Sequence, residues 1–338
     1  MNFDDPGVGP VVVEADGSMN TATPASYTSS SDWDGVAANV SPSVVSIDVA
    51  SEQGAGAGSG VIWNDEGHVV TNAHVIAGAT EVAITLADGR TYAAAVTGED
   101  ESTDLAVLQI TDPPADLRPI ETNDGTDIAV GAPVMAIGNP LGLSGTVTTG
   151  IVSALDRPVS TQSASANSAT VTNAIQTSAA INPGNSGGAL VNNDGELIGI
   201  NSAIASLSDG SGQSGSIGIG FAIPMRSVNS IVDQLIETGT AEHAFLGVGL
   251  NDASSQVEGA TLSGAGVTSV EPGTPAESVG LQKGDVIVRI DGERVGSAES
   301  LVAQVRERST GDEAELGVIR DGEEDAYTVT LDARPDEG

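Results

Sequence analysis

The chain has 338 residues, and its 47 acidic against 11 basic side chains give a formal net charge of −36. Such a charge argues against nucleic acid and anionic membranes as partners. The chain has no cysteine, which excludes disulfides and thiolate metal sites, and its three histidines are too few for a histidine-built metal cluster. We therefore expect neither a metal nor a cofactor.

The acidity is spread along the whole chain instead of lying in one tail. Lys283 is the single lysine, and aromatic residues are scarce. At molar salt the Debye length falls to about 3 Å, so repulsion among these carboxylates is largely screened. The composition therefore predicts a protein from a salt-adapted, haloarchaeal source.

Targeting signals are missing from the sequence. No apolar run approaches the length of a membrane span, and the first five residues, Met-Asn-Phe-Asp-Asp, lack the basic and then apolar pattern of a signal peptide. Either the protein is made without an export signal, which would leave it in the cytoplasm, or its true start lies upstream.

Residues 1–34 are rich in small and polar side chains without apolar periodicity, and we expect them to be mostly disordered. A helical turn at 36–40 and a strand at 43–49 follow. Glycine alternates with alanine or serine from Gly54 to Gly60, but no Gly-Lys-Ser/Thr follows, so a phosphate-binding loop is excluded. We interpret this run as a flexible hairpin connection.

Short segments of strand character with turn signals between them continue to about residue 223, which is typical of antiparallel barrels or sandwiches. Two polar loops, 160–168 and 206–216, interrupt the later strands and are predicted to be mobile. A helix over 225–237, closed by Gly239, ends this region. The predicted strands are 61–63, 68–71, 81–86, 92–96, 105–110, 133–137, 145–153, 174–177, 189–191, 196–202 and 217–223.

A boundary is predicted near residues 240–244, and a compact mixed unit follows to residue 331. Its predicted strands are 245–250, 267–270, 285–290, 313–319 and 326–331, and its predicted helices are 275–279 and 298–307.

One hydroxyl, Ser186, stands among glycines in Asn182-Pro183-Gly184-Asn185-Ser186-Gly187-Gly188. A Gly/Ser-rich turn is the plain interpretation. A serine nucleophile, however, needs an exposed Oγ and backbone amides aimed at the oxygen that becomes negative. The segment Gly184, Asn185 and Ser186 is the predicted oxyanion hole, with the amides of Gly184 and Ser186 as its donors.

His74 and Asp104 supply the partners that such a serine requires. His74 follows a predicted strand, and Asp104 precedes an apolar one. Each alone could be structural, but together with Ser186 they occur in the order His, Asp, Ser of chymotrypsin-type proteases. His74 would take the proton from Ser186, and a buried Asp104 would hold the imidazole in the correct tautomer.

The motifs around these three residues resemble the HtrA/Deg family of serine proteases. The resemblance covers about 36–331 and implies a mainly β chain, a chymotrypsin-like double antiparallel β-barrel followed by a small α+β PDZ domain. The implied domains are an N-terminal segment at 1–34, the protease at 35–240 and the PDZ domain at 244–333. The matching segments are 58–62, 71–75, 103–108, 136–140, 148–154, 175–190, 220–224, 245–248, 272–276 and 280–287.

The resemblance implies an ATP-independent serine endopeptidase that cleaves unfolded or damaged proteins in stress response and quality control. It further implies an extracytoplasmic, cell-envelope location and a homotrimer or higher multiple, with Tyr27 and Trp33 packing across the trimer axis. Trp33 could instead be a loose surface residue. Two alternatives remain open: a non-cleaving chaperone or holdase that binds peptides, and an esterase that uses the same triad.

Several departures from the family pattern matter. Ser178 replaces a usual aspartate, whereas Ala189 replaces a usual proline, which should matter less. The loop 51–60 is short, and one PDZ unit is present. Asn185 also lacks the charge with which digestive relatives pair a freshly cut N-terminus. Activity would then depend on loop ordering, with 160–168 and 206–216 as the candidate switches.

Specificity is predicted from position and resemblance together. Ala180 lies six residues before Ser186, where trypsin-like enzymes carry a charged selector. With Ile204 and Gly220 as neighbours, the S1 pocket should be small and apolar, which predicts cleavage after Val, Ala, Ile or Leu. In the C-terminal unit, the loop Phe245, Leu246, Gly247 and Val248 would bind the carboxylate of C-terminal peptides.

Overall fold

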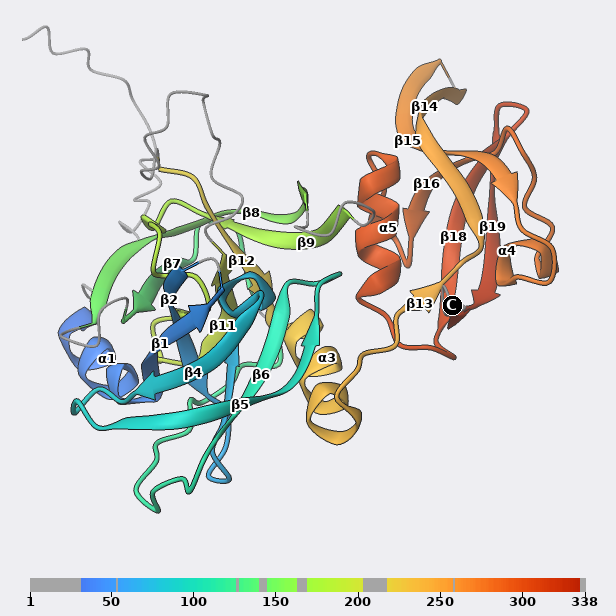
Figure 1. Ribbon diagram of the computed structural model, residues 1–338. Coiled ribbons are helices and arrows are strands. Elements are labelled where there is room, and N and C mark those ends of the chain that lie inside the picture. The colour runs from blue at the N-terminus through green and yellow to red at the C-terminus, as the bar shows by residue number, and fades with distance from the viewer. Residues whose placement is uncertain are drawn as a thin grey trace, which may run out of the picture. The chain divides into compact units, whose positions relative to one another are not determined.

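The computed structural model describes residues 32–52, 54–125, 128–139, 145–162, 169–202, 218–257 and 259–334. Within these ranges the chain forms two closed antiparallel barrels and a C-terminal unit built on one sheet (Figure 1). The prediction of a mainly β, chymotrypsin-like double barrel is confirmed.

The first barrel has the strand order β1-β2-β3-β6-β5-β4. Its strands are β1 (Val44–Ser51), β2 (Gly54–Ile62), β3 (His68–Thr71), β4 (Ala79–Thr85), β5 (Thr91–Asp100) and β6 (Leu105–Ile110). A helix, α1 (Trp33–Val40), and a 3-10 turn, Ser41–Ser43, precede it, and a one-turn helix, α2 (Ala73–Ile76), follows β3. The predicted helical turn is therefore longer at its start, where the Asp32 side chain caps Gly35 N.

The interpretation of the glycine run as a hairpin connection is wrong. Strand β2 contains all of it and pairs with β1 from Val44↔Val61 to Ser51↔Gly54. Packing requires glycine at the buried end of the strand: a Cβ on Gly60 would lie 2.7 Å from Val69 Cγ1 and 2.8 Å from Ile47 Cδ1, and one on Gly58 would lie 2.6 Å from Val75 Cγ1. Residues 54–57 of the run are exposed. The pattern marks a close approach of neighbours and not a loop.

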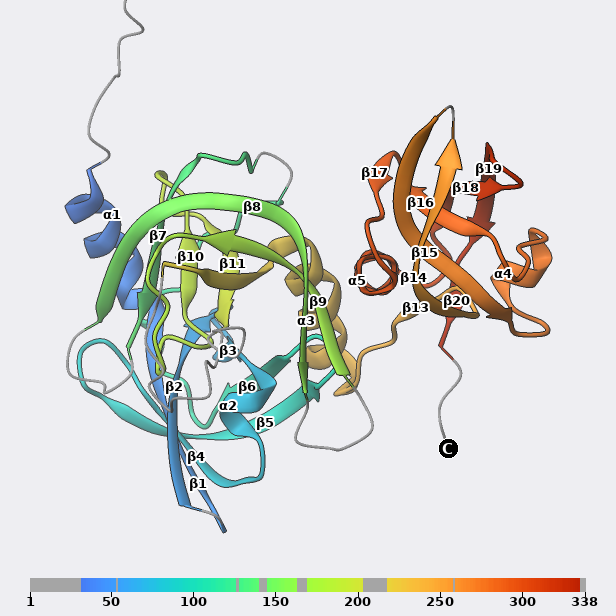
Figure 2. The same cartoon turned by 90° about the horizontal axis from the view of Figure 1, so that it is seen from above.

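The second barrel has the order β10-β11-β12-β9-β8-β7. Strands β8 and β9 are longer than predicted and run side by side (Figures 1 and 2). Residues 160–162 of the predicted loop 160–168 therefore belong to β8; residues 163–168 and the loop 206–216 lie outside the described residues. The strands are β7 (Pro133–Gly138), β8 (Thr146–Gln162), β9 (Ala169–Thr177), β10 (Ala189–Val191), β11 (Leu197–Ser202) and β12 (Gly220–Pro224).

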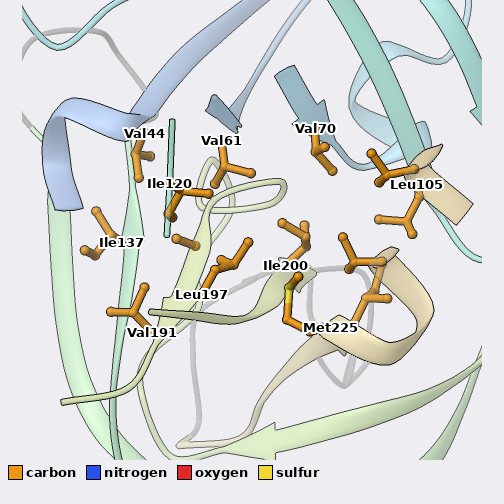
Figure 3. Packing of buried hydrophobic residues seen from close by; sticks show 14 of the residues in the cluster. Val44, Val61, Val70, Leu105, Ile120, Ile137, Val191, Leu197, Ile200 and Met225 are labelled. Atoms are coloured by element: carbon orange, nitrogen blue, oxygen red, sulfur yellow. The ribbon is translucent and has the colours of Figure 1, made fainter. Parts of the chain in front are cut away.

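One apolar cluster joins the two barrels (Figure 3). Val70 and Leu105 of the first barrel and Ile200 of the second point into it, together with Met225 of the following helix, α3 (Met225–Thr238). Because Leu105 directly follows Asp104, this packing fixes the start of β6 and with it the aspartate. Trp33 of α1 is half-buried against the same cluster, so it is not a loose surface residue.

The C-terminal unit is a sheet of order β14-β15-β16-β18-β19, with β17 paired to β16 and a small β13–β20 pair. Helix α5 packs on β14, β15 and β16 over its own apolar core. The elements are β13 (Ala244–Phe245), β14 (Val248–Val257), β15 (Ala260–Val270), α4 (Pro275–Ser278), β16 (Val286–Ile290), β17 (Glu293–Arg294), α5 (Ala298–Arg306), β18 (Glu313–Arg320), β19 (Glu323–Thr330) and β20 (Asp332–Ala333).

Among the helices of the described residues, none is long and apolar enough to cross a membrane.

Candidate active site

His74 and Asp104 form a close pair. His74 Nδ1 lies 2.8 Å from Asp104 Oδ1 and 2.9 Å from Oδ2, and the His74 amide donates to Oδ1 at 3.1 Å. Asp104 is 7% exposed, whereas 30% of the His74 side chain is exposed. The carboxylate therefore orients the ring from a buried position, and the ring itself remains open to solvent.

Asp104 reaches this position through an unusual backbone. Its φ is 60°, in the left-handed region that a non-glycine residue seldom adopts. Main-chain contacts stabilise it there: the Asp104 carbonyl accepts from Ala73 N at 3.2 Å and from Asn72 Nδ2 at 3.0 Å. Ser202 Oγ, at the end of β11, donates to Asp104 Oδ2 at 3.3 Å. Both barrels thus hold the same carboxylate.

Ser186 lies on the loop before β10 and is 5% exposed. Its carbonyl accepts from Ser59 N at 2.8 Å, and the Ser59 carbonyl in turn accepts from Thr71 Oγ1 at 2.7 Å. A Cβ on the next residue, Gly187, would lie 2.1 Å from Ser59 O and 2.3 Å from Thr71 Oγ1. The loop that carries Ser186, called the serine loop below, therefore packs against Thr71 at the end of β3. Thr71 lies three residues before His74.

The segment Gly184–Asn185–Ser186 is a tight turn. Gly184 has φ 97°, and Asn185 N donates to Asn182 O at 3.0 Å. Asn185 is 1% exposed and lies against Gly138, where a Cβ would come within 2.5 Å of Asn185 Oδ1. Only glycine fits at position 138, because a Cβ has no space there, and at position 184, because the backbone has a positive φ.

Two of the three predicted S1 residues lie together. A Cβ on Gly220 would meet Ala179 O and Ile181 Cδ1, each at 2.9 Å, so Gly220 faces the segment that contains Ala180. The Ala180 carbonyl accepts from Thr148 Oγ1 at 2.9 Å. Ile204 lies outside the described residues.

The four residues predicted for peptide binding in the C-terminal unit line one groove of about 190 Å³ between β14 and α5. Gly247 has φ 83°, and a Cβ there would collide with Thr274, so this loop turns sharply before β14. The opposite wall includes Leu301, Val305 and Arg306 of α5.

Several residues that hold the site together were not predicted from the sequence. Ser59 and Thr71 of the first barrel contact the loop of Ser186 in the second. Ser202 of the second barrel contacts Asp104 in the first. Each of these contacts crosses from one barrel to the other. The sequence Gly58-Ser59-Gly60, with one serine between two glycines, was the pattern that could have pointed to Ser59. Ser178, which departs from the family pattern, exchanges hydrogen bonds with Ile151: its Oγ accepts from Ile151 N at 3.0 Å and its N donates to Ile151 O at 3.1 Å.

In the part of the chain that the structure describes, no three His, Cys, Asp or Glu side chains are grouped closely enough to hold a metal ion.

Comparison with known proteins agrees with this geometry. Residues 58–200 match the trypsin-like peptidase domain family, and residues 244–331 match the PDZ domain family. The chain is 45% identical over 317 residues to the serine protease PepD of Mycobacterium tuberculosis, covering 90% of this chain and 66% of PepD. It is 43% identical over 272 residues to the periplasmic serine endoprotease DegP of Escherichia coli, covering 79% of this chain and 55% of DegP.

The chain thus spans just under two thirds of the length of PepD and little more than half of that of DegP. Among solved structures, the HtrA-type protease AlgW with a tripeptide matches with a TM-score of 0.68 and 35% identity. That match covers 90% of this chain and 98% of the AlgW chain.

Proposed function

We propose that this chain, which belongs to the HtrA-type family of trypsin-like serine proteases, is an ATP-independent endopeptidase that cleaves unfolded or damaged proteins. The observation that carries the proposal is the His74–Asp104 pair, together with the contact from Ser59 that anchors the loop of Ser186 to the first barrel. A buried carboxylate, an open imidazole and a serine beside glycine amides are the parts that acyl transfer needs.

In this reaction Ser186 Oγ attacks the carbonyl carbon of the scissile peptide bond while His74 Nε2 takes the hydroxyl proton. Asp104 holds the other ring nitrogen and stabilises the imidazolium that forms. The amides of Gly184 and Ser186 donate to the oxygen that becomes negative. The proton then passes to the leaving amine, and the same steps with water release the acyl group from Ser186.

Unfolded casein and an active-site fluorophosphonate, both applied at molar salt, test the proposal. An endopeptidase cleaves casein and is labelled by the fluorophosphonate. A peptide-binding holdase does neither, and an esterase is labelled but leaves casein intact.

The S1 pocket of the proposed enzyme accepts small aliphatic side chains. Three features support this: Ala180 carries no charge, Gly220 lies against the segment 179–181, and Ile181 fills the space beside it. Cleavage after Val, Ala, Ile or Leu is expected, and mass spectrometry of casein fragments tests it. Cuts chiefly after Arg or Lys would refute this specificity.

The C-terminal unit binds peptides with a free carboxylate. The sharp loop at Gly247 brings backbone amides to the end of the groove, where a peptide can add as a strand beside β14. A labelled peptide with a free C-terminus should raise fluorescence anisotropy on binding, and the same peptide with a C-terminal amide should not. Equal binding of both peptides would remove this assignment.

Family membership also supports an extracytoplasmic location and assembly into a trimer or a higher multiple. Trp33 is half-buried in α1 against the apolar cluster, and Tyr27 lies outside the described residues. Replacing both by alanine should shift the light-scattering mass from trimer to monomer. An unchanged mass would exclude these aromatic residues as the contacts.

A further inference from the structure

Ser59 lies at the centre of β2 in the sequence Gly58-Ser59-Gly60, with 0% of its surface exposed. Its three polar groups, the amide, the carbonyl and the hydroxyl, make four hydrogen bonds to segments outside β1 and β2. Such a concentration of contacts on one buried serine requires an explanation beyond strand pairing, since most buried hydroxyls need only one partner.

Two of these contacts reach the two ends of the turn before β10. Ser59 Oγ donates to Gly184 O at 2.7 Å, and Ser59 N donates to Ser186 O at 2.8 Å. Gly184 and Ser186 supply the two amides of the proposed oxyanion hole. Ser59, a residue of the other barrel, therefore binds the carbonyls of both.

The remaining contacts fix Ser59 itself. Its hydroxyl accepts from Asn139 N at 2.8 Å, and its carbonyl accepts from Thr71 Oγ1 at 2.7 Å. Asn139 follows β7 of the second barrel, and Thr71 ends β3, three residues before His74. Ser59 therefore joins the serine loop, the strand that leads to His74 and the second barrel.

Gly184 needs such a restraint. With no Cβ and φ 97°, it has access to a wide range of backbone angles, so its peptide planes could rotate. Ser59 Oγ fixes the peptide plane that contains Gly184 O and Asn185 N, and Ser59 N fixes the plane that contains Ser186 O and Gly187 N. The two donor amides, Gly184 N and Ser186 N, belong to the adjoining planes. Anchoring the two carbonyls therefore restrains the turn that carries both donors, and oxyanion donors act only when they are preorganised.

We propose that Ser59 is a positioning residue of the oxyanion hole: its side-chain hydroxyl holds Gly184, and its main-chain amide holds Ser186, in the orientation that the transition state requires. The inference rests on the proposed peptidase function. It assigns to Ser59 an effect on the transition state and not on the binding of substrate.

The expected change follows from this role. Losing a whole oxyanion donor costs about 10²–10³ in kcat, and a donor that is only loosened should cost less. Ser59→Ala should therefore lower kcat by roughly tenfold to a hundredfold and leave KM within about twofold, because the lost interaction acts in the transition state alone. The affinity for a peptidyl boronic acid, which forms a tetrahedral adduct with a serine, should fall in parallel with kcat.

Ser46 offers a matched control. It lies opposite Ser59 in the β1–β2 register and is also 0% exposed, but its Oγ has no hydrogen-bond partner. Ser46→Ala removes the same atom from the same barrel without touching the serine loop. This variant should keep the kcat and the boronate affinity of the wild type.

The experiment uses the full chain at molar salt. Fluorophosphonate titration first counts active sites, so that kcat refers to folded enzyme only, and a peptide ending in valine serves as substrate and as the boronate. A parallel loss of kcat and boronate affinity in Ser59→Ala, with KM and the Ser46→Ala variant unchanged, supports the inference. Retention of kcat within twofold, or equal losses in both variants, overturns it.

Ser59→Cys replaces the hydroxyl by a thiol, which fills the same site but is a weaker hydrogen-bond donor. This variant is measured in place of Ser59→Ala if the alanine variant does not fold. An intermediate loss of boronate affinity in Ser59→Cys supports the inference, and wild-type affinity contradicts it. A wild-type protein that the fluorophosphonate fails to label would contradict the proposed function itself. A labelled wild type with an equally active Ser59→Ala would contradict only the role of Ser59.

Discussion

Ser202 Oγ donates a hydrogen bond to Asp104 Oδ2 at 3.3 Å, and this bond crosses from the second barrel to the first. The same carboxylate holds His74 through both of its oxygens. The orientation of the imidazole therefore depends on residues that lie 98 positions apart in the chain.

Ser202→Ala should lower kcat/KM modestly. Hydrogen bonds to charged groups contribute about 1.5–3 kcal/mol, and a bond as long as 3.3 Å should contribute less. A loss of about 1 kcal/mol corresponds to roughly a fivefold change. Ser227→Ala, which substitutes a buried serine in α3, provides the control. Peptide hydrolysis measures both, and identical rates in the two variants would show that Ser202 does not support Asp104.

Acid should destabilise the protease part through Asp100, which ends β5 just before the turn to Asp104. Burial raises the pKa of this carboxyl, but its hydrogen bonds with His243, Thr103 and Ser102 outweigh that effect, so the pKa lies below its ordinary value of 3.8. A lowered folded-state pKa contributes stability that is fully present above 3.8 and is lost as the pH falls through the folded value.

Asp100→Asn should therefore flatten the acid limb of the stability curve. Denaturation between pH 5 and pH 2, followed through the fluorescence of Trp33 and Trp63, measures the effect. The free energy of unfolding should fall less steeply in the variant below about pH 4. Parallel curves for the variant and the wild type would exclude Asp100 as a source of acid sensitivity.

The C-terminal unit contains a buried ion pair and an exposed one, which allows a direct comparison. Arg320 binds Asp285 through Nε and Nη2, each at 2.7 Å, and the side chains are 28% and 2% exposed. Arg289 binds Glu324 at 3.1 Å with half of the arginine side chain exposed. Leaving one charge of a buried pair alone costs about 3–5 kcal/mol, whereas exposed pairs contribute about 0–1 kcal/mol.

Arg320→Met should destabilise this unit by about 2 kcal/mol, since partial exposure of Arg320 reduces the cost of leaving Asp285 unpaired. Arg289→Met should change stability by less than about 1 kcal/mol. Hydrogen exchange of β16 and β18 in the full chain measures both. Equal protection in the two variants would mean that the buried pair contributes no more than the exposed one.

Salt should stabilise the whole protein. At about 0.01 M salt the Debye length is about 30 Å, so the net charge of −36 favours the expanded chain; at molar salt the repulsion is screened. Among the described residues, three arginines of the C-terminal unit, Arg289, Arg308 and Arg320, pair with carboxylates of the same unit, whereas in the longer protease part Arg90 alone does so. The protease part should therefore unfold first.

Melting curves followed through tryptophan fluorescence, together with rates of peptide hydrolysis, from millimolar to molar salt, test this expectation. Melting temperature and activity should both rise steeply with salt. A protein equally stable and equally active at both extremes would show that its acidity is not a salt adaptation.

The sequence places His74, Asp104 and Ser186 in short, dense motifs, and the structure brings His74 and Asp104 together. The role of Ser186 stays a prediction. The many short strands with turn signals indicated antiparallel barrels or sandwiches, and the double barrel was predicted from the resemblance of the motifs to the HtrA/Deg family. The glycine run at 54–60 misled the interpretation, since small residues that allow a close approach look the same in sequence as those that allow flexibility.

Ser59 and Ser202 could not be assigned roles from the sequence. Their hydrogen bonds join positions 125 and 98 residues apart, and a local pattern carries no information about such contacts. The lengths of β8 and β9 were also missed, because their polar, small residues suggest a loop and only their mutual pairing makes them strands.

The central claim, that Ser186 is the nucleophile of a peptidase, is tested most directly by mapping the site of fluorophosphonate attachment. The protein is labelled at molar salt, digested and sequenced by mass spectrometry, alongside casein cleavage by the wild type, Ser186→Ala and His74→Ala. We predict one adduct, on Ser186, which both substitutions abolish together with casein cleavage, apart from the ~10³–10⁴-fold residual rate over water that such variants retain. An adduct on another residue, or casein cleavage by Ser186→Ala at a rate near that of the wild type, would contradict the claim.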